Sequence, residues 1–308
     1  MKIPSFAKLN LGLEAGPRRP DGYHALATLY QTISLHDTLS FSFEGREWQI
    51  ETRCGRRDKY DDADLPAGTD NLVWQALERL RPHMGRQGVR VRIQKRIPVG
   101  AGLGGGSSNA AAVLLAVNRA LRLGLSWQAL YAAAASLGSD VPFFLHGGTA
   151  LGVGRGEVVC PLPDVWKRAV FYVLAVPPER LSTEAVYEAL DRTCRGLTPK
   201  KLSGIILKDT FLVLDRGVPM QLQLKNDLES AACRMETVVR RVRRAFAEAG
   251  AVRPALTGSG TGWYALVPGR AAARRMERRL AGYDWFVRTG CFVTRRRFAR
   301  AFRPPRPC

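Results

Sequence analysis

A glycine-rich turn in the middle of the chain has the residue types that bind phosphate. The turn, from Pro98 to Ser108, reads PVGAGLGGGSS, and residues 89–93 before it alternate between apolar and polar, which predicts a strand. Residues 109–123 after it are rich in Ala and Leu and predict a helix. Glycine lets the backbone approach a ligand closely, and a helix N-terminus presents unpaired N–H groups to an anion. The turn therefore predicts a phosphate cradle, the alternative being a flexible turn without a ligand.

Two common phosphate motifs do not fit this turn. A Walker loop needs Lys and then Ser or Thr after its glycines, and no lysine follows these. A dinucleotide fingerprint needs an acidic residue about 20 positions further on. Gly100, Gly102 and Gly105 have its spacing, but residues 115–127 contain no acid. The strand before and the helix after the turn still favour phosphate binding over an empty turn.

Two charged residues stand in apolar surroundings. Asp140 lies between a turn of small residues and the apolar residues 141–144, and a partly desolvated carboxylate is a good proton acceptor. A turn or helix-capping aspartate explains the local sequence equally well. Lys8 lies on a predicted strand over residues 5–13, where a buried lysine would need an anionic partner. Taken alone, Lys8 would more simply face solvent.

The elements that must position these groups alternate irregularly along the chain. Strands are expected at residues 27–35 and 37–43, with a loop at 16–24 before them, and a helix at 71–81 is expected to begin at Thr69-Asp70. Further expected helices are 127–136, capped by Ser126, 184–191, and a long helix 228–249, capped by Asp227. Because no regular strand–helix–strand rhythm appears, the α+β class is predicted. We expect a first domain at 1–158 that contains the glycine-rich turn, a second domain at 159–290 and a flexible basic tail at 291–308.

Length and composition indicate a globular protein. The 308 residues, with 46% hydrophobic and 24% charged, are typical of two domains. No apolar run is long enough to span a bilayer, the first residues lack the apolar segment of a signal peptide, and six scattered cysteines suggest reduced thiols. These features predict a cytoplasmic protein that does not bind a membrane.

The formal net charge of +20 comes mainly from arginine. Basic chains attract nucleic acid, anionic membranes or anionic metabolites, although a GC-rich genome would enrich arginine in any protein. The basic end of the chain has no folded recognition motif around it. We therefore do not expect a nucleic-acid partner.

Several separated motifs, taken together, resemble a known superfamily. They are FAKLNL at 6–11, the turn at 98–108, GSDVPFF at 138–144 and TGSG at 257–260. Their order resembles the kinases of galactose, homoserine, mevalonate and phosphomevalonate. The segments RPDGYH at 19–24, GRGE at 154–157 and NDLE at 226–229 are similar to the branch that phosphorylates 4-diphosphocytidyl-2-C-methyl-D-erythritol, a cytidine diphosphate ester of methylerythritol.

The resemblance implies a fold and a reaction. The fold is an ATP-binding domain like domain 2 of ribosomal protein S5, followed by a ferredoxin-like domain, with the site between them. The reaction transfers the γ-phosphoryl group of ATP to the 2-hydroxyl of the methylerythritol moiety, on the non-mevalonate route to isoprenoids. Asp140, beside Lys8, would take the proton of the substrate hydroxyl or orient that hydroxyl. A Mg²⁺ ion would bridge the phosphates, with Ser108 as the residue that contacts the ion. ATP would contact Asn71, Lys95 and the turn, whose members are Pro98, Val99, Gly100, Ala101, Gly102, Leu103, Gly104, Gly105, Gly106, Ser107 and Ser108.

The resemblance also implies a substrate site. Tyr187 would stack on the cytosine, while Tyr23 could stack on it and His24 could hydrogen-bond its edge. Without the resemblance, Tyr187 would be a core tyrosine and His24 a loop histidine. The other expected substrate contacts are Asn10, Thr183, Gly258, Ser259 and Gly260.

Two rival functions and the oligomeric state stay open at this point. A sister kinase of homoserine or a mevalonate-pathway alcohol would share the turn and Asp140 but would not need the cytosine site. A basic nucleic-acid-binding protein without enzymatic activity would leave the coexistence of Lys8, Asp140 and the turn unexplained. The sequence does not determine whether the chain is a monomer or a homodimer.

Overall fold

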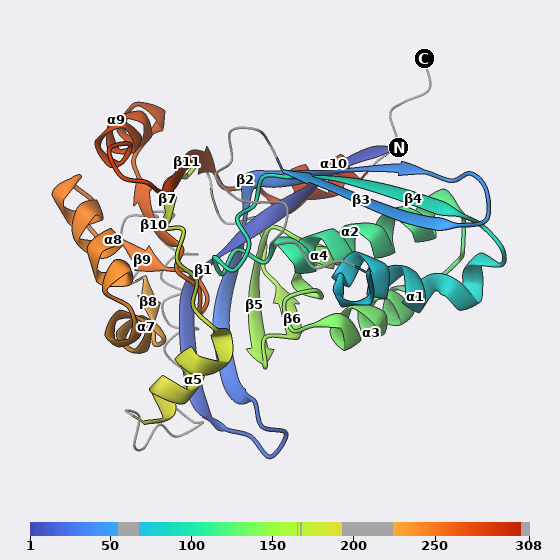
Figure 1. Cartoon of the computed structure of the whole chain (residues 1–308), viewed down its shortest axis with the longest axis horizontal. Helices are drawn as coiled ribbons and strands as arrows, with labels where there is room; N and C mark the ends of the chain where they lie inside the picture. The colour runs from blue at the N-terminus through green and yellow to red at the C-terminus, as the bar shows by residue number, and fades with distance from the viewer. Residues whose placement is uncertain (55–67, 165, 167, 193–223, 303–308) are drawn as a thin grey trace.

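Two sheets and two groups of helices make up the computed structural model, which describes residues 1–54, 68–164, 166, 168–192 and 224–302. The larger sheet has seven strands, and its main path runs β3-β4-β2-β1-β8, with β5 attached to β2 and β6 attached to β5. The smaller sheet has the order β11-β7-β10-β9. Figure 1 shows the long strands β1 and β2 between helices α1 to α4 on one side and α7 to α9 on the other. This mixed architecture, built mainly from antiparallel pairs, agrees with the predicted α+β class.

The hairpin of β1 and β2 forms the centre of the larger sheet. The strand β1 extends over Lys2–Arg18 and β2 over His24–Ser42, so the expected loop at 16–24 shrinks to residues 19–23. The strands expected at 27–35 and 37–43 are one strand, because irregularities in the pairing with β1 absorb the break. The remaining strands of this sheet are β3 (Trp48–Cys54), β4 (Val89–Lys95), β5 (Thr149–Gly154), β6 (Val158–Pro161) and β8 (Lys225–Asn226).

Four helices cover one face of this sheet and pack into one apolar core with it. They are α1 (Leu72–Met84), α2 (Gly105–Ala120), α3 (Trp127–Leu137) and α4 (Phe143–His146). Ser126 caps α3 as predicted. The helix α1 is capped by Asn71, whose side chain accepts from the N–H of Val73, because residues 68–70 form a short 3-10 turn instead. The helix α2 begins four residues earlier than expected, so the last residues of the glycine-rich turn form its first turn.

The smaller sheet carries the second group of helices. Its strands are β7 (Phe171–Val176), β9 (Ala255–Leu256), β10 (Trp263–Val267) and β11 (Phe286–Cys291), and its helices are α5 (Thr183–Asp191), α7 (Glu229–Met235), α8 (Thr237–Glu248) and α9 (Arg270–Leu280). The long helix expected at 228–249 is two helices, because Glu236 has extended backbone angles. Asp227 does not cap it, since its carboxylate accepts from the N–H of Ala15 in β1.

The two sheets share a core, which links the two halves of the chain. Apolar residues of β1 and β2, such as Leu9 and Ile33, pack with Tyr172 of β7 and Tyr264 of β10. The strand β8 from the second half pairs with β1 in parallel. The expected boundary between the two domains lies at residue 158, but this residue begins β6, which pairs with β5 in the larger sheet. The larger sheet therefore continues past the expected boundary. The contact between the sheets explains how residues from both halves reach one site.

The arginine-rich end differs from the flexible tail expected at 291–308. Cys291 ends β11, and α10 (Arg295–Ala301) follows with Thr294 as its cap. Phe298 in α10 is buried and packs on Phe6 at a ring-centroid distance of 5.8 Å. The apolar Phe298 therefore anchors this segment to the larger sheet, and residues 303–308 of the expected tail lie outside the described residues.

Candidate functional site

Two adjoining cavities contain most of the residues that the sequence singled out. One, of about 310 Å³, is lined by Asn71, Lys95 and every residue from Pro98 to Ser107. The other, of about 790 Å³, is lined by Lys8, Asn10 and Asp140, together with residues of the β1–β2 turn, α5 and the turn at 258–259. Gly100, Gly102, Gly104 and Ser107 line both cavities. The glycine-rich turn therefore forms the boundary between them.

The glycine-rich turn leads directly into the N-terminus of α2. Gly104 is the N-cap residue and has a φ of 69°, a left-handed conformation that favours glycine. The first N–H groups of a helix lack partners within the helix. These N–H groups point out of the N-terminus of α2, where the helix dipole also favours an anion. This arrangement has the features predicted for a phosphate cradle.

A second glycine turn from the other half of the chain packs tightly against the first. A Cβ built on Gly102 would overlap the carbonyl oxygen of Thr257, and one on Gly260 would lie 2.5 Å from the Gly102 nitrogen. Gly258 and Ser259 line the larger cavity. Gly260, expected to contact substrate, does not line it, because it faces the backbone of the glycine-rich turn instead.

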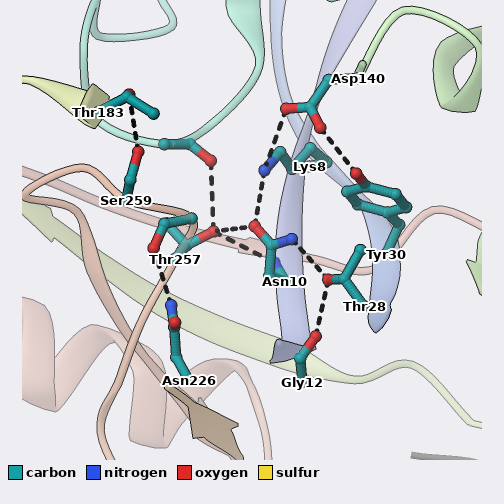
Figure 2. Close-up of polar contacts among 12 residues, drawn as sticks. Lys8, Asn10, Gly12, Thr28, Tyr30, Asp140, Thr183, Asn226, Thr257 and Ser259 are labelled. Atoms are coloured by element: carbon teal, nitrogen blue, oxygen red, sulfur yellow. Dashed lines mark hydrogen bonds and ion pairs between the residues drawn. The ribbon is translucent and has the colours of Figure 1, made fainter. Parts of the chain in front are cut away.

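Lys8 and Asp140 form an ion pair in the wall of the larger cavity. The Lys8 Nζ lies 3.3 Å from Asp140 Oδ2, and it donates to Asn10 Oδ1 over 2.6 Å (Figure 2). Only 3% of the Lys8 side chain is exposed, against 30% of the Asp140 side chain. The buried ammonium therefore has its anionic partner, while the carboxylate remains accessible to a ligand in the cavity.

Asn10 connects this pair to both halves of the chain. Its Nδ2 donates to Thr28 Oγ1 over 2.8 Å, and its backbone oxygen accepts from the hydroxyl of Tyr264 over 2.8 Å. The Thr257 hydroxyl lies 3.3 Å from Asn10 Oδ1 (Figure 2). These bonds restrict the orientation of the amide that holds Lys8. Asn10 lines the cavity as expected, but its side chain is largely engaged in this network.

Two buried polar residues of the site were not among the predicted ones. Tyr30 in β2 donates from its hydroxyl to Asp140 Oδ1 over 2.8 Å. Burial raises the pKa of Tyr30 well above its ordinary value, and the nearby negative charge of Asp140 raises it further. Asn109 in α2 lines the smaller cavity, and its buried Oδ1 has no hydrogen-bond partner within the described part of the chain. Local sequence does not identify either residue, because an apolar strand and an apolar helix surround them.

Three residues that were expected to contact ATP or its metal ion have hydrogen-bond or ion-pair partners in the structure. Lys95 Nζ lies 2.5 Å from Asp37 Oδ2, and both residues are buried. The Asn71 side chain caps α1 while the residue lines the cavity. Ser108 is buried, and its Oγ lies 2.7 Å from Ser5 Oγ. The expected magnesium contact at Ser108 does not agree with this geometry, because the hydroxyl faces Ser5 and lines neither cavity, whereas Ser107 lines both.

The aromatic residues expected to read a base all line the larger cavity. The rings of His24 and Tyr187 stack at a centroid distance of 5.1 Å. His24 Nδ1 lies 2.8 Å from the Gly16 oxygen and Nε2 lies 3.3 Å from Asp191 Oδ1, so both ring nitrogens have partners. Burial raises the pKa of the Tyr187 hydroxyl. Both rings line the cavity from different elements, β2 and α5.

Tyr23 and Thr183 also line this cavity. The Tyr23 ring is 55% exposed, and the Arg155 guanidinium lies over it at 4.8 Å from the ring centroid. Thr183 Oγ1 lies 2.8 Å from Ser259 Oγ across the gap between α5 and the second glycine turn (Figure 2). The larger cavity is thus lined by an ion pair, by aromatic rings and by the Arg155 cation.

Within the described ranges, three or more His, Cys, Asp or Glu side chains do not gather anywhere in a way that could hold a metal ion. No helix there has the length and apolar character to cross a membrane.

Comparisons with known proteins agree with these features. The family model described as the GHMP kinases N terminal domain matches residues 71–148. The 4-diphosphocytidyl-2-C-methyl-D-erythritol kinase of Moorella thermoacetica is 38% identical over 285 residues, covering 91% of this chain and 94% of the relative. The kinase of the same name from Rhodococcus jostii is 41% identical over 286 residues, covering 92% and 88%.

Solved structures are similar over most of the chain. A crystal structure of 4-(cytidine 5'-diphospho)-2C-methyl-D-erythritol kinase has a TM-score of 0.77 and 33% identity, covering 95% of this chain and 99% of its own. A homoserine kinase from Cytophaga hutchinsonii has a TM-score of 0.68 and 18% identity, covering 95% of each chain. The second similarity supports the shared fold alone.

Proposed function

This chain belongs to the 4-diphosphocytidyl-2-C-methyl-D-erythritol kinase family, and from that premise we propose how its residues bind the two substrates and transfer the phosphoryl group. The enzyme is an ATP-dependent kinase that phosphorylates 4-diphosphocytidyl-2-C-methyl-D-erythritol in isoprenoid biosynthesis. The acceptor is the 2-hydroxyl of the methylerythritol moiety. The observation that carries the assignment is the Lys8–Asp140 pair, which lies beside the glycine-rich turn shared by both cavities.

ATP occupies the smaller cavity, with its phosphates on the glycine-rich turn. The backbone N–H groups at the start of α2 hold the phosphates. Apolar residues such as Leu72, Ile93 and Val99 line the same cavity and suit a base. Lys95 and Asn71 contact the nucleotide from its walls, although Lys95 stays paired with Asp37. The γ-phosphate then lies at the boundary between the cavities, next to the acceptor.

The transfer step needs alignment more than covalent chemistry. The acceptor oxygen bonds to the γ-phosphorus as the bond from that phosphorus to the β,γ-bridging oxygen breaks, and ADP leaves. The hydroxyl proton passes to the Asp140 carboxylate and from there to solvent, so the products are the 2-phosphate, ADP and one proton. Lys8 pairs with the carboxylate, and its ammonium also reduces the negative charge near the transferred group.

The hydroxyl oxygen available where the two cavities meet suits a magnesium ion that is held mainly by the phosphates of the nucleotide. Mg²⁺ commonly binds one or two protein oxygens together with substrate phosphates. The Ser107 hydroxyl is positioned for such a contact, because Ser107 lines both cavities. The ion would neutralise part of the negative charge on the β- and γ-phosphates.

The cytidine diphosphate part of the acceptor substrate lies along the larger cavity. Tyr187 supplies a face for the cytosine, together with Tyr23 at the open end. His24 contacts the pyrimidine edge by exchanging its bond to Asp191, the more exposed of its two partners. Arg18 and Arg155 line the same cavity and attract the diphosphate. Thr183, Ser259, Gly258 and Asn10 contact the remaining polar groups.

We assign the larger sheet and α1 to α4 to the ATP-binding domain, of the type found in domain 2 of ribosomal protein S5. The smaller sheet is assigned to a ferredoxin-like domain. Its order β11-β7-β10-β9 places the strands as fourth, first, third and second along the chain, which supports the assignment. We place the enzyme in the cytoplasm, because the six cysteines are scattered along the sequence as expected of reduced thiols.

An assay of ADP release tests the function directly. The purified protein with Mg²⁺ and ATP is offered the cytidine diphosphate ester, homoserine and mevalonate in parallel. Turnover with the cytidine compound alone is expected, because neither other alcohol fills the aromatic end of the larger cavity. Turnover with homoserine or mevalonate at a comparable rate would contradict the assigned substrate site.

A further inference from the structure

Tyr30 contacts Asp140 on the side opposite to Lys8. The Tyr30 hydroxyl donates to Oδ1 over 2.8 Å, while the Lys8 Nζ lies 3.3 Å from Oδ2 (Figure 2). Donors on both oxygens restrain the plane of the carboxylate, since rotating it would break both contacts. A carboxylate has about four lone-pair positions, so acceptor positions remain for the substrate hydroxyl.

The ring of Tyr30 lies in a slot that leaves it little freedom. It stacks on Phe143 at a centroid distance of 4.8 Å. A Cβ built on Gly152 would overlap its ring, and one on Gly156 would lie 2.5 Å from its hydroxyl oxygen. The two glycines thus leave the space that the ring and its hydroxyl occupy. The hydroxyl is therefore positioned before substrate binds, which spares the enzyme the cost of ordering it during the reaction.

The charges around the site keep this hydroxyl a donor. Asp140 is faced by Lys8 from β1, Tyr30 from β2 and Tyr187 from α5, and Arg155 and Glu157 lie in the turn between β5 and β6. Burial and the charge of Asp140 raise the pKa of Tyr30. The hydroxyl thus stays protonated at neutral pH, and its bond to an anion is charge-assisted.

We propose that Tyr30 is a positioning residue for the phosphoryl transfer, whose hydroxyl donates to the Asp140 carboxylate and orients it toward the substrate hydroxyl. The inference rests on the proposed function of Asp140. Because a proton on the carboxylate would compete with the Tyr30 bond, the pH dependence of the reaction is a suitable readout of this bond.

The test compares Tyr30→Phe, which keeps the ring, with a matched control, Tyr172→Phe. Tyr172 is equally buried, and its hydroxyl accepts from the N–H of Leu35 outside both cavities. For Tyr30→Phe we expect a decrease of about tenfold in kcat. We also expect the acid limb of the pH profile of kcat/KM to move up by about one pH unit. The KM values should change little. The control should keep the wild-type profile.

Two further measurements make the result independent of folding and of substrate identity. A fluorinated tyrosine at position 30, a stronger donor, should move the acid limb to lower pH. A ¹³C NMR titration of the Asp140 carboxyl carbon, assigned by its loss in Asp140→Asn, should show a higher midpoint in Tyr30→Phe than in wild type. An unchanged acid limb and an unchanged NMR midpoint would overturn the proposal. A wild-type enzyme inactive on the cytidine compound would instead refute the proposed function, while the NMR titration would still decide the role of Tyr30.

Discussion

The Lys8 ammonium lies 3.3 Å from Asp140 Oδ2, although 131 positions of the chain separate the two residues. Lys8 comes from the central strand β1, and Asp140 from the turn that precedes α4. A buried lysine with a partly exposed carboxylate beside it is suited to proton transfer from a ligand, because the charge of the pair is balanced before the ligand arrives. The position of the pair beside the glycine-rich turn supports its proposed role in phosphoryl transfer.

Replacing Asp140 by Asn should remove most of the turnover. The amide keeps the shape of the side chain and can still accept from Tyr30, but it cannot take a proton from the substrate hydroxyl. We expect kcat to decrease by roughly 10²- to 10⁴-fold, with the dissociation constant of ATP, measured by calorimetry, nearly unchanged. Asp164→Asn is the control, because Asp164 accepts from Arg295 outside both cavities. Near-normal turnover of Asp140→Asn would show that the carboxylate is dispensable.

Replacing Gly102 by Ala should separate the two glycine turns. A Cβ there would overlap the Thr257 carbonyl oxygen, and the φ of +74° adds backbone strain. Gly124→Ala is the matched control, since Gly124 has a φ of +70° with nothing within 4 Å of the added Cβ. The control should lose about 1 kcal/mol of the free energy of unfolding from strain alone, and Gly102→Ala about 1–3 kcal/mol more from overpacking.

Urea denaturation of both variants measures this difference, and an ATP titration should show weaker binding for Gly102→Ala alone. Equal losses of stability in the two variants would indicate that the turns do not press on one another in solution.

Replacing Tyr187 by Ala should weaken binding of the cytidine substrate selectively. Stacking of a base on an aromatic ring contributes about 1–3 kcal/mol, so the KM for the cytidine compound should rise by roughly 5- to 150-fold. Tyr187→Phe keeps the ring and should change this KM little. The KM for ATP serves as the internal control, because Tyr187 lines the larger cavity only. A parallel rise in both KM values would instead point to a general disturbance of α5.

Replacing Asn109 by Ala should reduce discrimination between nucleotides. Its buried Oδ1 lies in the wall of the smaller cavity without a partner in the described residues. An unpaired buried acceptor costs about 1–3 kcal/mol, so a donor on the nucleotide, such as the 6-amino group of adenine, should satisfy it. Wild type should therefore prefer ATP to purine riboside triphosphate, which lacks that group. Competition binding measures the ratio of the two affinities, which should fall about tenfold or more in Asn109→Ala. An unchanged ratio would show that Asn109 does not contact the base.

Patterns of nearby residues predicted much of the local structure. The alternation at 89–93 identified β4, and Ser126 identified the start of α3. Local signals failed where distant contacts decided the outcome. Asp227 resembled a helix cap, but β1 lies close enough for the Ala15 N–H to bind its carboxylate. The arginine-rich end resembled a flexible tail, but the burial of Phe298 holds α10 against the larger sheet.

The sequence by itself determined the chemistry that is available, because glycine spacing, a carboxylate in an apolar segment and separated motifs are properties of the residues in order. Only the tertiary structure decided which groups meet. The bond from Tyr30 to Asp140, the contact of Gly260 with the glycine-rich turn and the pairing of Ser108 with Ser5 all depend on how the strands and turns pack. Contacts between distant segments depend on the shape and volume of side chains across the whole core, and these are not encoded within any short stretch of the chain.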